Sequence, residues 1–214
     1  LFAKIVGVFL MKSEGILIIG ASKVPRLLGH YLESHGRHVV LIDSNESNVS
    51  KAKELGLEAM TSNIYSDTLL DNIELNDVGY LMALTGNTDI NKYAINKFSK
   101  QFGENGSFRL VTTEEMNDPN NNPEEGLFSH TDDYNTLVEV AKKYPSIHEI
   151  ELNDISHYEG LIEVTNNDKE IIPLFLKDNN NELYIISSYN KAVKKIAKGW
   201  QLVYLGKPIG IQKF

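Results

Sequence analysis

The residues best suited to chemistry in this chain are Gly20 and Asp43, because each stands at the end of a short apolar run. The first run covers 16–19 and the second covers 39–42, with a segment of helical periodicity between them. This order predicts strand, tight turn, helix and strand, a βαβ unit whose acidic residue follows its first glycine by about 20 positions. In such a unit the helix N-terminus binds a phosphate, and the acid accepts hydrogen bonds from a ribose diol.

The phosphate-binding pattern of this unit is incomplete. The three glycine positions of the dinucleotide pattern G-x-G-x-x-G are occupied by Gly20, Ser22 and Pro25. The Ser22 hydroxyl is suited either to bonding a phosphate oxygen or to capping the helix. Pro25 is compatible with a first helical turn, although it loses the close packing that glycine permits. Two hypotheses stay open on these residues: a nucleotide-binding unit, and a domain that kept the turn and lost the ligand.

Composition places the chain among globular proteins. It has 214 residues, of which 42% are hydrophobic, enough for one large domain or for one domain and a small appendage. Its 21 basic and 29 acidic residues give a net charge of −8. Neither half of the chain is basic, which argues against nucleic acid as a partner. The absence of cysteine excludes disulfides and thiolate metal sites.

Apolar runs and helical segments continue to alternate after Asp43. Further strands are predicted at 57–60, 78–84 and 108–111, and helices are predicted to begin near 44, 66 and 90. Strands that alternate with helices in this way predict a doubly wound parallel α/β sheet, in which ligands bind at the carboxyl ends of the strands. The polar segments at those ends, expected to meet in one crevice, are 20–22, 43–45, 62–63 and 85–87.

The sequence pattern changes in the C-terminal part of the chain, and the polar loop 117–123 is a candidate domain boundary. A helix capped by 131–133 and a strand at 147–152 follow, and they are candidates for the sixth strand of the sheet and its preceding helix. Four short strands are predicted after them, at 161–164, 171–176, 183–186 and 202–205, with a hairpin turn at 178–181. These strands predict a small, antiparallel, β-rich subdomain. The lysine-rich segment 191–198 is expected to be a helix with a solvated face.

The sequence contains no catalytic constellation. It has no cysteine nucleophile, no G-x-S-x-G elbow and no phosphate-loop pattern. The spacing of His30, His35 and His38 does not place them on one helix face, which favours surface histidines over metal ligands. A dehydrogenase needs a substrate domain and an acid–base residue, and the part of the chain after Tyr158 is too short for that domain. The sequence therefore predicts a binding module rather than an enzyme.

Three segments, GILIIGAS, VVLIDSNESNVSKAKELGLEAMTSN and GYLMALTGNTDINKYAINKF, resemble the TrkA-N domain, also called the N-terminal domain of regulators of potassium conductance (RCK). The phrase LMALTGNTDIN followed by KFSKQFG resembles the version fused to bacterial sodium/proton antiporters of the cation:proton antiporter class. LFSH and IIPLFL are similar, more weakly, to the cytosolic tail of that class. The resemblance implies a Rossmann-like fold and a cytosolic regulatory domain that dimerises and binds NAD(H), an adenine nucleotide or an ion.

The resemblance also implies a ligand site. The residues that match its positions are, in chain order, Gly20, Ala21, Ser22, Asp43, Ser44, Asn63, Thr85, Gly86 and Asn87. Residues 20–22 match the phosphate turn, 43–44 the ribose end, and 85–87 the loop after the fourth strand. Asn63 follows the third strand, where the family usually has Asp. Arg26 is our own addition to this set, because it lies one helical turn into the first helix and is suited either to reaching a phosphate or to lying solvated.

The first ten residues, LFAKIVGVFL, are apolar but shorter than the roughly 20 residues that a membrane span needs. They fit either an opening strand or helix, or a linker, and the resemblance favours a linker from a transmembrane antiporter domain. We therefore expect a linker (1–14), a Rossmann-like domain (15–153) that forms a homodimer, and a β-rich subdomain (154–214), at the cytoplasmic face of the cell membrane. The alternatives are a ligand-free dimerisation module and a short NAD-dependent oxidoreductase, in which Asp43 would favour NAD over NADP.

Overall fold

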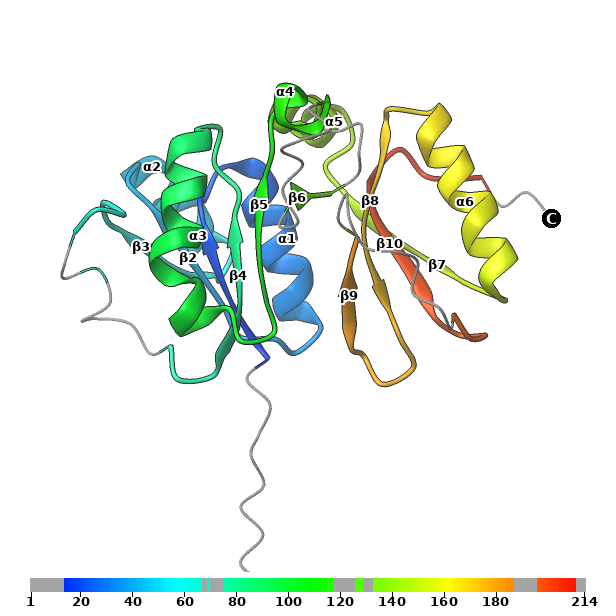
Figure 1. Cartoon of the computed structure of the whole chain (residues 1–214), viewed down its shortest axis with the longest axis horizontal. Helices are drawn as coiled ribbons and strands as arrows, with labels where there is room; N and C mark the ends of the chain where they lie inside the picture. Colours follow the sequence, from blue (N-terminus) through cyan, green and yellow to red (C-terminus); the bar gives the residue numbers. More distant parts are fainter. Residues whose placement is uncertain are drawn as a thin grey trace, which may run out of the picture.

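Figure 1 shows the chain as a computed structural model. The structure describes residues 14–66, 69, 75–117, 126–128, 133–186 and 196–210. Several sequence predictions lie outside these residues: the linker over 1–13, most of the helix predicted to begin near 66, nearly all of the loop 117–123, the cap positions 131–132 and most of the lysine-rich segment. Within the described ranges no helix has the length and apolarity needed to cross a membrane.

A parallel sheet organises the N-terminal part of the molecule. Its strands are β1 (Gly15–Ile19), β2 (Val39–Asp43), β3 (Glu58–Thr61), β4 (Val78–Ala83), β5 (Gly106–Leu110) and β6 (Gly126–Leu127). Their order is β3-β2-β1-β4-β5-β6, and every pair is parallel. The strand order reverses between β1 and β4, which is the switch point of a doubly wound sheet. The predicted fold class is therefore confirmed, while β6 is a strand that the sequence patterns did not predict.

Helices cover both faces of this sheet. They are α1 (Lys23–Ser34), α2 (Glu46–Glu54), α3 (Thr88–Phe102), α4 (Thr113–Asn117) and α5 (Tyr134–Lys143). Strand β1 is buried along its whole length, with Ile16 and Ile18 in the core on the side of α1, and Leu17 and Ile19 in the core on the side of α3. A strand covered on both faces has no polar side to present, which explains why the sequence of β1 is apolar throughout.

A second, antiparallel sheet follows. Its strands are β7 (Ile147–Glu151), β8 (Ile171–Lys177), β9 (Leu183–Ile185) and β10 (Gln201–Gly206), in the order β7-β10-β8-β9. The helix α6 (Ile155–Asn167) lies against this sheet on the side away from the parallel sheet (Figure 1). The β8–β9 hairpin turns through Asn181, whose φ of 62° is left-handed, a conformation that asparagine tolerates. The small β-rich C-terminal part is thus confirmed.

Two predictions for this region are wrong. The segment 161–164 is not a strand but part of α6, where Leu161 and Thr165 are both buried one helical turn apart. A short apolar run fits a helix face as well as a strand, and the Asp154 cap, which accepts from the His157 N–H at 2.9 Å, begins a helix here. The strand at 147–152 is β7, which pairs with β10 rather than with the parallel sheet. The division of the chain at residue 153 therefore stays a prediction.

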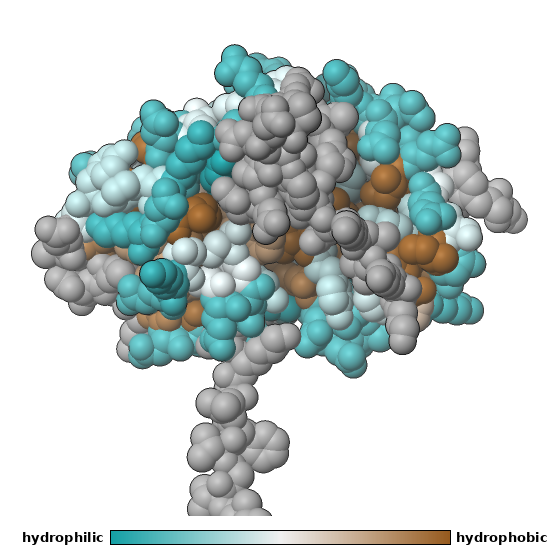
Figure 2. Space-filling view, viewed as in Figure 1, coloured by the Kyte–Doolittle hydropathy of each residue, from teal (hydrophilic) through white to brown (hydrophobic). Residues whose placement is uncertain are grey.

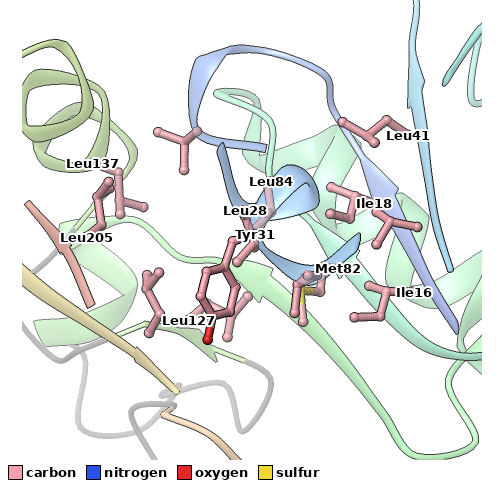
Figure 3. Close-up of a cluster of buried hydrophobic side chains, with 14 of the residues drawn as sticks. Ile16, Ile18, Leu28, Tyr31, Leu41, Met82, Leu84, Leu127, Leu137 and Leu205 are labelled. Atoms are coloured by element: carbon pink, nitrogen blue, oxygen red, sulfur yellow. The ribbon is translucent and has the colours of Figure 1, made fainter. Parts of the chain in front are cut away.

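One buried core joins the two sheets, and Figure 3 shows part of it. Its members from the helices and strands on either side include Leu28, Tyr31, Leu127, Leu137 and Leu205. On the face shown in Figure 2 the surface is mainly hydrophilic, with hydrophobic residues in several separate patches. Helix α1 begins at the predicted phosphate turn and ends against the second sheet, so it connects the candidate site to the C-terminal part.

Candidate functional site

The turn between β1 and α1 requires glycine at its first position. Gly20 has a φ of +112°, and a Cβ there would lie 3.1 Å from the backbone oxygen of Leu84. Its N–H donates to the Ile42 carbonyl at 2.7 Å, which ties the end of β1 to β2. A side chain at this position would be strained by the backbone angle and would crowd β4. The first glycine of the predicted pattern is therefore explained by local geometry before any ligand is considered.

Asp43, at the end of β2, holds the two turns that border the site. Its Oδ2 accepts from the Ala21 N–H at 2.8 Å and from Asn48 Nδ2 at 3.0 Å, and its Oδ1 accepts from the Asn45 N–H at 2.9 Å. A carboxylate has about four acceptor positions, so one on Oδ1 is left for a further donor. Asp43 is half-buried, and it can therefore receive one hydroxyl of a ribose without losing its present partners.

The N-terminus of α1 carries polar groups that the fold leaves unused. Ser22 occupies the N-cap position, yet its side chain makes no capping bond, and within the described part of the chain its buried hydroxyl has no hydrogen-bond partner. The capping hypothesis for Ser22 is therefore wrong. Pro25 is buried in the first turn, as predicted for a residue that needs no backbone donor. A helix N-terminus with an unpaired hydroxyl favours an anion.

Arg26 lies beside this turn. Its Nη1 donates to the backbone oxygen of Ala21. Burial lowers the pKa of Arg26 while the nearby Asp43 carboxylate raises it, and burial is the larger effect. The guanidinium is therefore folded back over the turn and placed next to Asp43, so the alternative of a freely solvated side chain is not what the structure shows.

The loop after β4 is shaped by its own hydrogen bonds. Asn91, which is 2% exposed, accepts from the Thr85 N–H at 3.0 Å and from its hydroxyl at 2.7 Å. Asn87 caps α3 by accepting from the backbone N–H groups of Asp89 and Ile90. A Cβ on Gly86 would lie 2.8 Å from the ring of Tyr134 on α5. The side chains of this loop are thus occupied in positioning it.

A cavity of about 210 Å³ opens at the carboxyl ends of β1, β2, β3 and β4. It is lined by the predicted site residues Gly20, Asp43, Ser44, Asn63 and Thr85. Ala21, Ser22 and Arg26 lie at the adjoining turn, while Gly86 lines a neighbouring cavity. Tyr65, Ile64 and Ile90 also line the first cavity and were not predicted from the sequence. The crevice expected from the polar strand ends is present, and a ligand role for each residue stays a prediction.

The second cavity, of about 290 Å³, shares Thr85 with the first. It lies toward β5 and α5, and its acidic side chains are Glu114 and Asp133. Asp133 caps α5 by accepting from the Thr136 N–H at 2.9 Å, and this bond, ahead of the opposing effect of burial, lowers its pKa. The two cavities are neighbours that have Thr85 in common, and they lie at the switch point of the sheet, where ligands of doubly wound folds bind.

A buried ion pair supports the wall of the second cavity. Arg109 of β5 donates two hydrogen bonds to Glu115 of α4, at 3.1 and 3.0 Å, and its side chain is 4% exposed. Burial raises the pKa of Glu115, but the bonds from Arg109 and Lys92 outweigh it and lower the pKa to about 2. Glu115 is therefore charged at neutral pH and fixes α4 against the sheet.

The parallel sheet, the glycine turn and the acid after β2 define a Rossmann-type nucleotide-binding fold. Residues 16–116 match the TrkA-N domain family. A comparison with curated proteins gives no match.

Three of the solved structures that are similar to the chain illustrate the likeness. The NAD(P)-binding domain of an exopolyphosphatase-related protein from Archaeoglobus fulgidus is 13% identical, with 46% of this chain and 74% of that one covered and a TM-score of 0.40. The TrkA-N domain of the inner membrane protein ybaL from Escherichia coli is 18% identical, with 45% and 71% covered and a TM-score of 0.40. The GsuK RCK domain is 13% identical, with 92% and 44% covered and a TM-score of 0.46.

Proposed function

We propose that this chain is the nucleotide-binding regulatory domain of a membrane cation/proton antiporter, the sodium/proton type being the first candidate. Domains of the TrkA-N and RCK class are regulatory and often bind nucleotides. The observation that supports a retained ligand is the 210 Å³ cavity, which brings Gly20, Asp43 and Asn63 together at the carboxyl ends of parallel strands.

A nucleotide fits this geometry in one orientation. Its phosphate lies at the N-terminus of α1, where the Ser22 hydroxyl is unpaired and Arg26 is adjacent. One ribose hydroxyl donates to the remaining acceptor position on Asp43 Oδ1. The base then extends past Asp43 toward Asn63 and Tyr65, which line the far end of the cavity. The phosphate turn lacks two of its three glycines, and the Ser22 side chain takes over part of their role.

The presence of two neighbouring cavities favours NAD(H) over an adenine mononucleotide. The cavities share Thr85 and lie on either side of the switch point. A dinucleotide has one nucleoside for each cavity, whereas a mononucleotide fills the first alone. Glu114 and Asp133 border the second cavity and disfavour the additional negative charge of a triphosphate.

The antiporter assignment is supported by the resemblance of 81–91 and 97–103 to the corresponding segments of antiporter-fused domains. We place the domain at the cytoplasmic face of the membrane, as a homodimer that changes its pose when ligand binds. Helix α1 offers a physical connection, since it runs from the phosphate turn to the second sheet. The effect on transport is limited by the difference in ligand affinity between the two poses.

Two alternatives are weighed against this function. The departures from the glycine pattern at Ser22 and Pro25 favour a ligand-free dimerisation module. An NAD-dependent oxidoreductase needs an acid–base residue beside the nicotinamide, and the described part of the second cavity presents Glu114 and Asp133, both of which lie at helix starts. We favour the regulatory function because the cavity at Asp43 is formed and its polar groups are in place.

A thermal-shift panel tests the proposed function. The chain is heated with NAD, NADH, NADP, AMP, ADP, ATP and divalent ions in turn, and size-exclusion chromatography with light scattering gives its oligomeric state. Ligand at 100 times its dissociation constant adds about 2.7 kcal/mol of stability, a shift of several degrees. A shift with NAD or NADH that is absent in Asp43→Ala supports the proposal. If no nucleotide raises the melting temperature and the protein is a dimer, the ligand-free dimerisation module becomes the better assignment.

A further inference from the structure

Arg37 is a buried arginine without an ion pair among the described residues. The residue is 8% exposed, and the side-chain hydrogen bonds that it donates to described residues both go to backbone carbonyl groups. A buried charge is costly, and proteins usually pair it with a carboxylate. The stability of the fold alone therefore does not explain why a guanidinium is buried at this position.

The end of α1 fixes the backbone of Arg37. Gly36 has a φ of +81°, and its N–H donates to the Glu33 carbonyl at 2.9 Å. The Arg37 N–H donates to the Leu32 carbonyl at 3.1 Å. Together these bonds form a Schellman motif, in which a left-handed residue, usually glycine, closes the end of a helix. Arg37 is the next residue along the chain, so the closed end of α1 determines where its side chain starts.

The two carbonyl groups that bind Arg37 belong to different parts of the chain. Nη1 donates to the Glu14 carbonyl at 3.3 Å, and Nη2 donates to the Asn181 carbonyl at 2.9 Å. Glu14 directly precedes β1, whereas Asn181 lies in the turn of the β8–β9 hairpin. The start of β1 and this hairpin both lie at the lower end of the molecule in Figure 1. One guanidinium thus joins the start of the parallel sheet to the second sheet.

Hydrogen bonds within the hairpin turn hold the Asn181 carbonyl in place. The Asp178 Oδ1 accepts from the Asn180 N–H at 2.8 Å and from the Glu182 N–H at 2.9 Å. The Asn181 N–H donates to the Asp178 carbonyl at 3.0 Å. Because these bonds tie the turn together, a displacement of the hairpin also displaces the carbonyl that binds Arg37.

The start of β1 is the other end of this connection. The Gly15 N–H donates to the Asp77 carbonyl at 2.8 Å, and the Ile16 N–H donates to the His38 carbonyl at 2.9 Å. Both bonds lie within the N-terminal part of the molecule. Exchange of these two amide hydrogens with solvent therefore reports how often the start of β1 opens.

We propose that Arg37 is a clamp that transmits a displacement of the β8–β9 hairpin to the start of β1. A guanidinium is a rigid planar fork, and it keeps both bonds only while the two carbonyl groups stay in one relative position. The segment that leads into β1 thereby responds to the position of the second sheet. A use of the clamp in regulating transport rests on the proposed function, whereas the coupling itself requires no nucleotide.

A double-mutant cycle followed by amide hydrogen exchange tests the clamp. Asp178→Ala removes the side-chain bonds that hold the hairpin turn, and Arg37→Met removes the guanidinium and keeps an apolar stem. Nitrogen-15 NMR measures exchange at Gly15 and Ile16 in the full chain, for wild type, each single variant and the double variant. Lys53→Met, at an exposed position of α2, is the matched control for the loss of a positive charge.

Asp178→Ala is expected to accelerate exchange at Gly15 and Ile16 about fivefold, the lower end of the range for coupled sites. The same change is expected to have no effect on these amides when it is combined with Arg37→Met, and its full effect when it is combined with Lys53→Met. Equal acceleration with and without Arg37, or no acceleration in the presence of Arg37, overturns the proposal.

Two further measurements separate the clamp from general stability and folding. The amide of Leu81, which is fully buried in β4, reports opening of the whole sheet, and exchange at Gly15 and Ile16 is expressed relative to it. If circular dichroism shows that Arg37→Met is unfolded, Arg37→Lys replaces it, because lysine keeps the charge without the planar fork. Transmission as strong in Arg37→Lys as in wild type overturns the clamp. The nucleotide panel is a separate experiment, so either proposal can fail while the other stands.

Discussion

The carboxylate of Asp43 accepts a hydrogen bond from the backbone N–H of Ala21 at 2.8 Å. The acid at the end of β2 thus holds the turn that we propose as the phosphate site, and the two halves of the predicted nucleotide site are one hydrogen-bonded unit. A ligand that bonds Asp43 through its ribose consequently also senses the position of the turn.

Asp43→Ala is expected to affect both stability and binding. It removes three hydrogen bonds, and since a bond to a charged group contributes about 1.5–3 kcal/mol, we expect the free energy of unfolding to fall by at least 2 kcal/mol. Nucleotide affinity is expected to fall at least tenfold. Urea unfolding and calorimetry measure the two effects. Glu54→Gln, an exposed acid at the end of α2, is the control, and equal affinity in Asp43→Ala and the control would refute the ribose role.

His38 is expected to make the stability of the fold depend on pH. Burial lowers the pKa of His38, but the hydrogen bonds to Asp77 at 2.8 Å and to Glu58 at 3.1 Å outweigh it and raise the pKa above 6.5. The stabilisation is therefore complete below pH 6.5 and is lost as pH rises through the folded-state pKa. His38→Gln is expected to remove this pH dependence in urea unfolding. His30→Gln, at an exposed position of α1, is expected to retain the pH dependence. If the free energy of unfolding of His38→Gln still changes with pH as in wild type, His38 is not its source.

The Arg109–Glu115 pair gives a prediction at acid pH. Glu115→Gln leaves the buried Arg109 without its carboxylate, and we expect the free energy of unfolding at pH 7 to fall by about 2 kcal/mol. Because the folded-state pKa of Glu115 is about 2, wild type is expected to lose this stabilisation as pH falls from about 4.5 toward 2. The variant is expected to lack that part of the acid loss. Glu114→Gln, the exposed neighbour on α4, is the control and should resemble wild type at each pH.

Glu149 is expected to lock α1 to the second sheet. It accepts from Lys177 at 2.6 Å and from the Tyr31 hydroxyl, and the Lys177 side chain is 8% exposed. Glu149 is itself exposed, and only its partner Lys177 is buried. Because solvent screens the carboxylate, Glu149→Ala is expected to lower the free energy of unfolding by about 1–2 kcal/mol. The double variant Glu149→Leu/Lys177→Met is expected to lose less than the single one.

Hydrogen exchange monitored by mass spectrometry supplies a second readout for Glu149. Faster exchange in Glu149→Ala should be concentrated at the end of α1 and in β7 and β8. Glu151→Gln, an exposed acid on the same strand, is the control. Loss of protection spread evenly over both sheets would show that Glu149 contributes to general stability and not to this connection.

The sequence predicted the elements whose signals are local. Strands β1 and β4 are apolar because both faces are covered, and Gly20 and Asp43 are recognisable from their spacing. Strand β6 has two residues and exists through its pairing with β5, so no periodicity could reveal it. Strand β7 belongs to the antiparallel sheet because it pairs with β10, which lies about 50 residues later in the chain. Such a long-range pairing leaves no local signal in the sequence.

Some features of the candidate site also depend on the folded chain and could not be predicted from local sequence. Tyr65 is one tyrosine in a polar segment, and its exposure beside a cavity is a property of the folded chain. The unpaired hydroxyl of Ser22 likewise depends on how α1 is placed, since the sequence allowed it to cap the helix or to bond a phosphate. Asn87 was predicted to face the ligand, and its place at the start of α3 occupies its side-chain oxygen as a cap.

Amide chemical shifts show directly whether a nucleotide binds between the α1 turn and Asn63. The chain is labelled with nitrogen-15 and titrated with NADH in a two-dimensional NMR experiment. We expect the largest shifts to cluster at the amides of 20–23, 43–45 and 62–65, which line the first cavity and its turn. No shift at saturating NADH, or shifts clustered instead on the far side of α5 around Lys142 and Lys169, would contradict it.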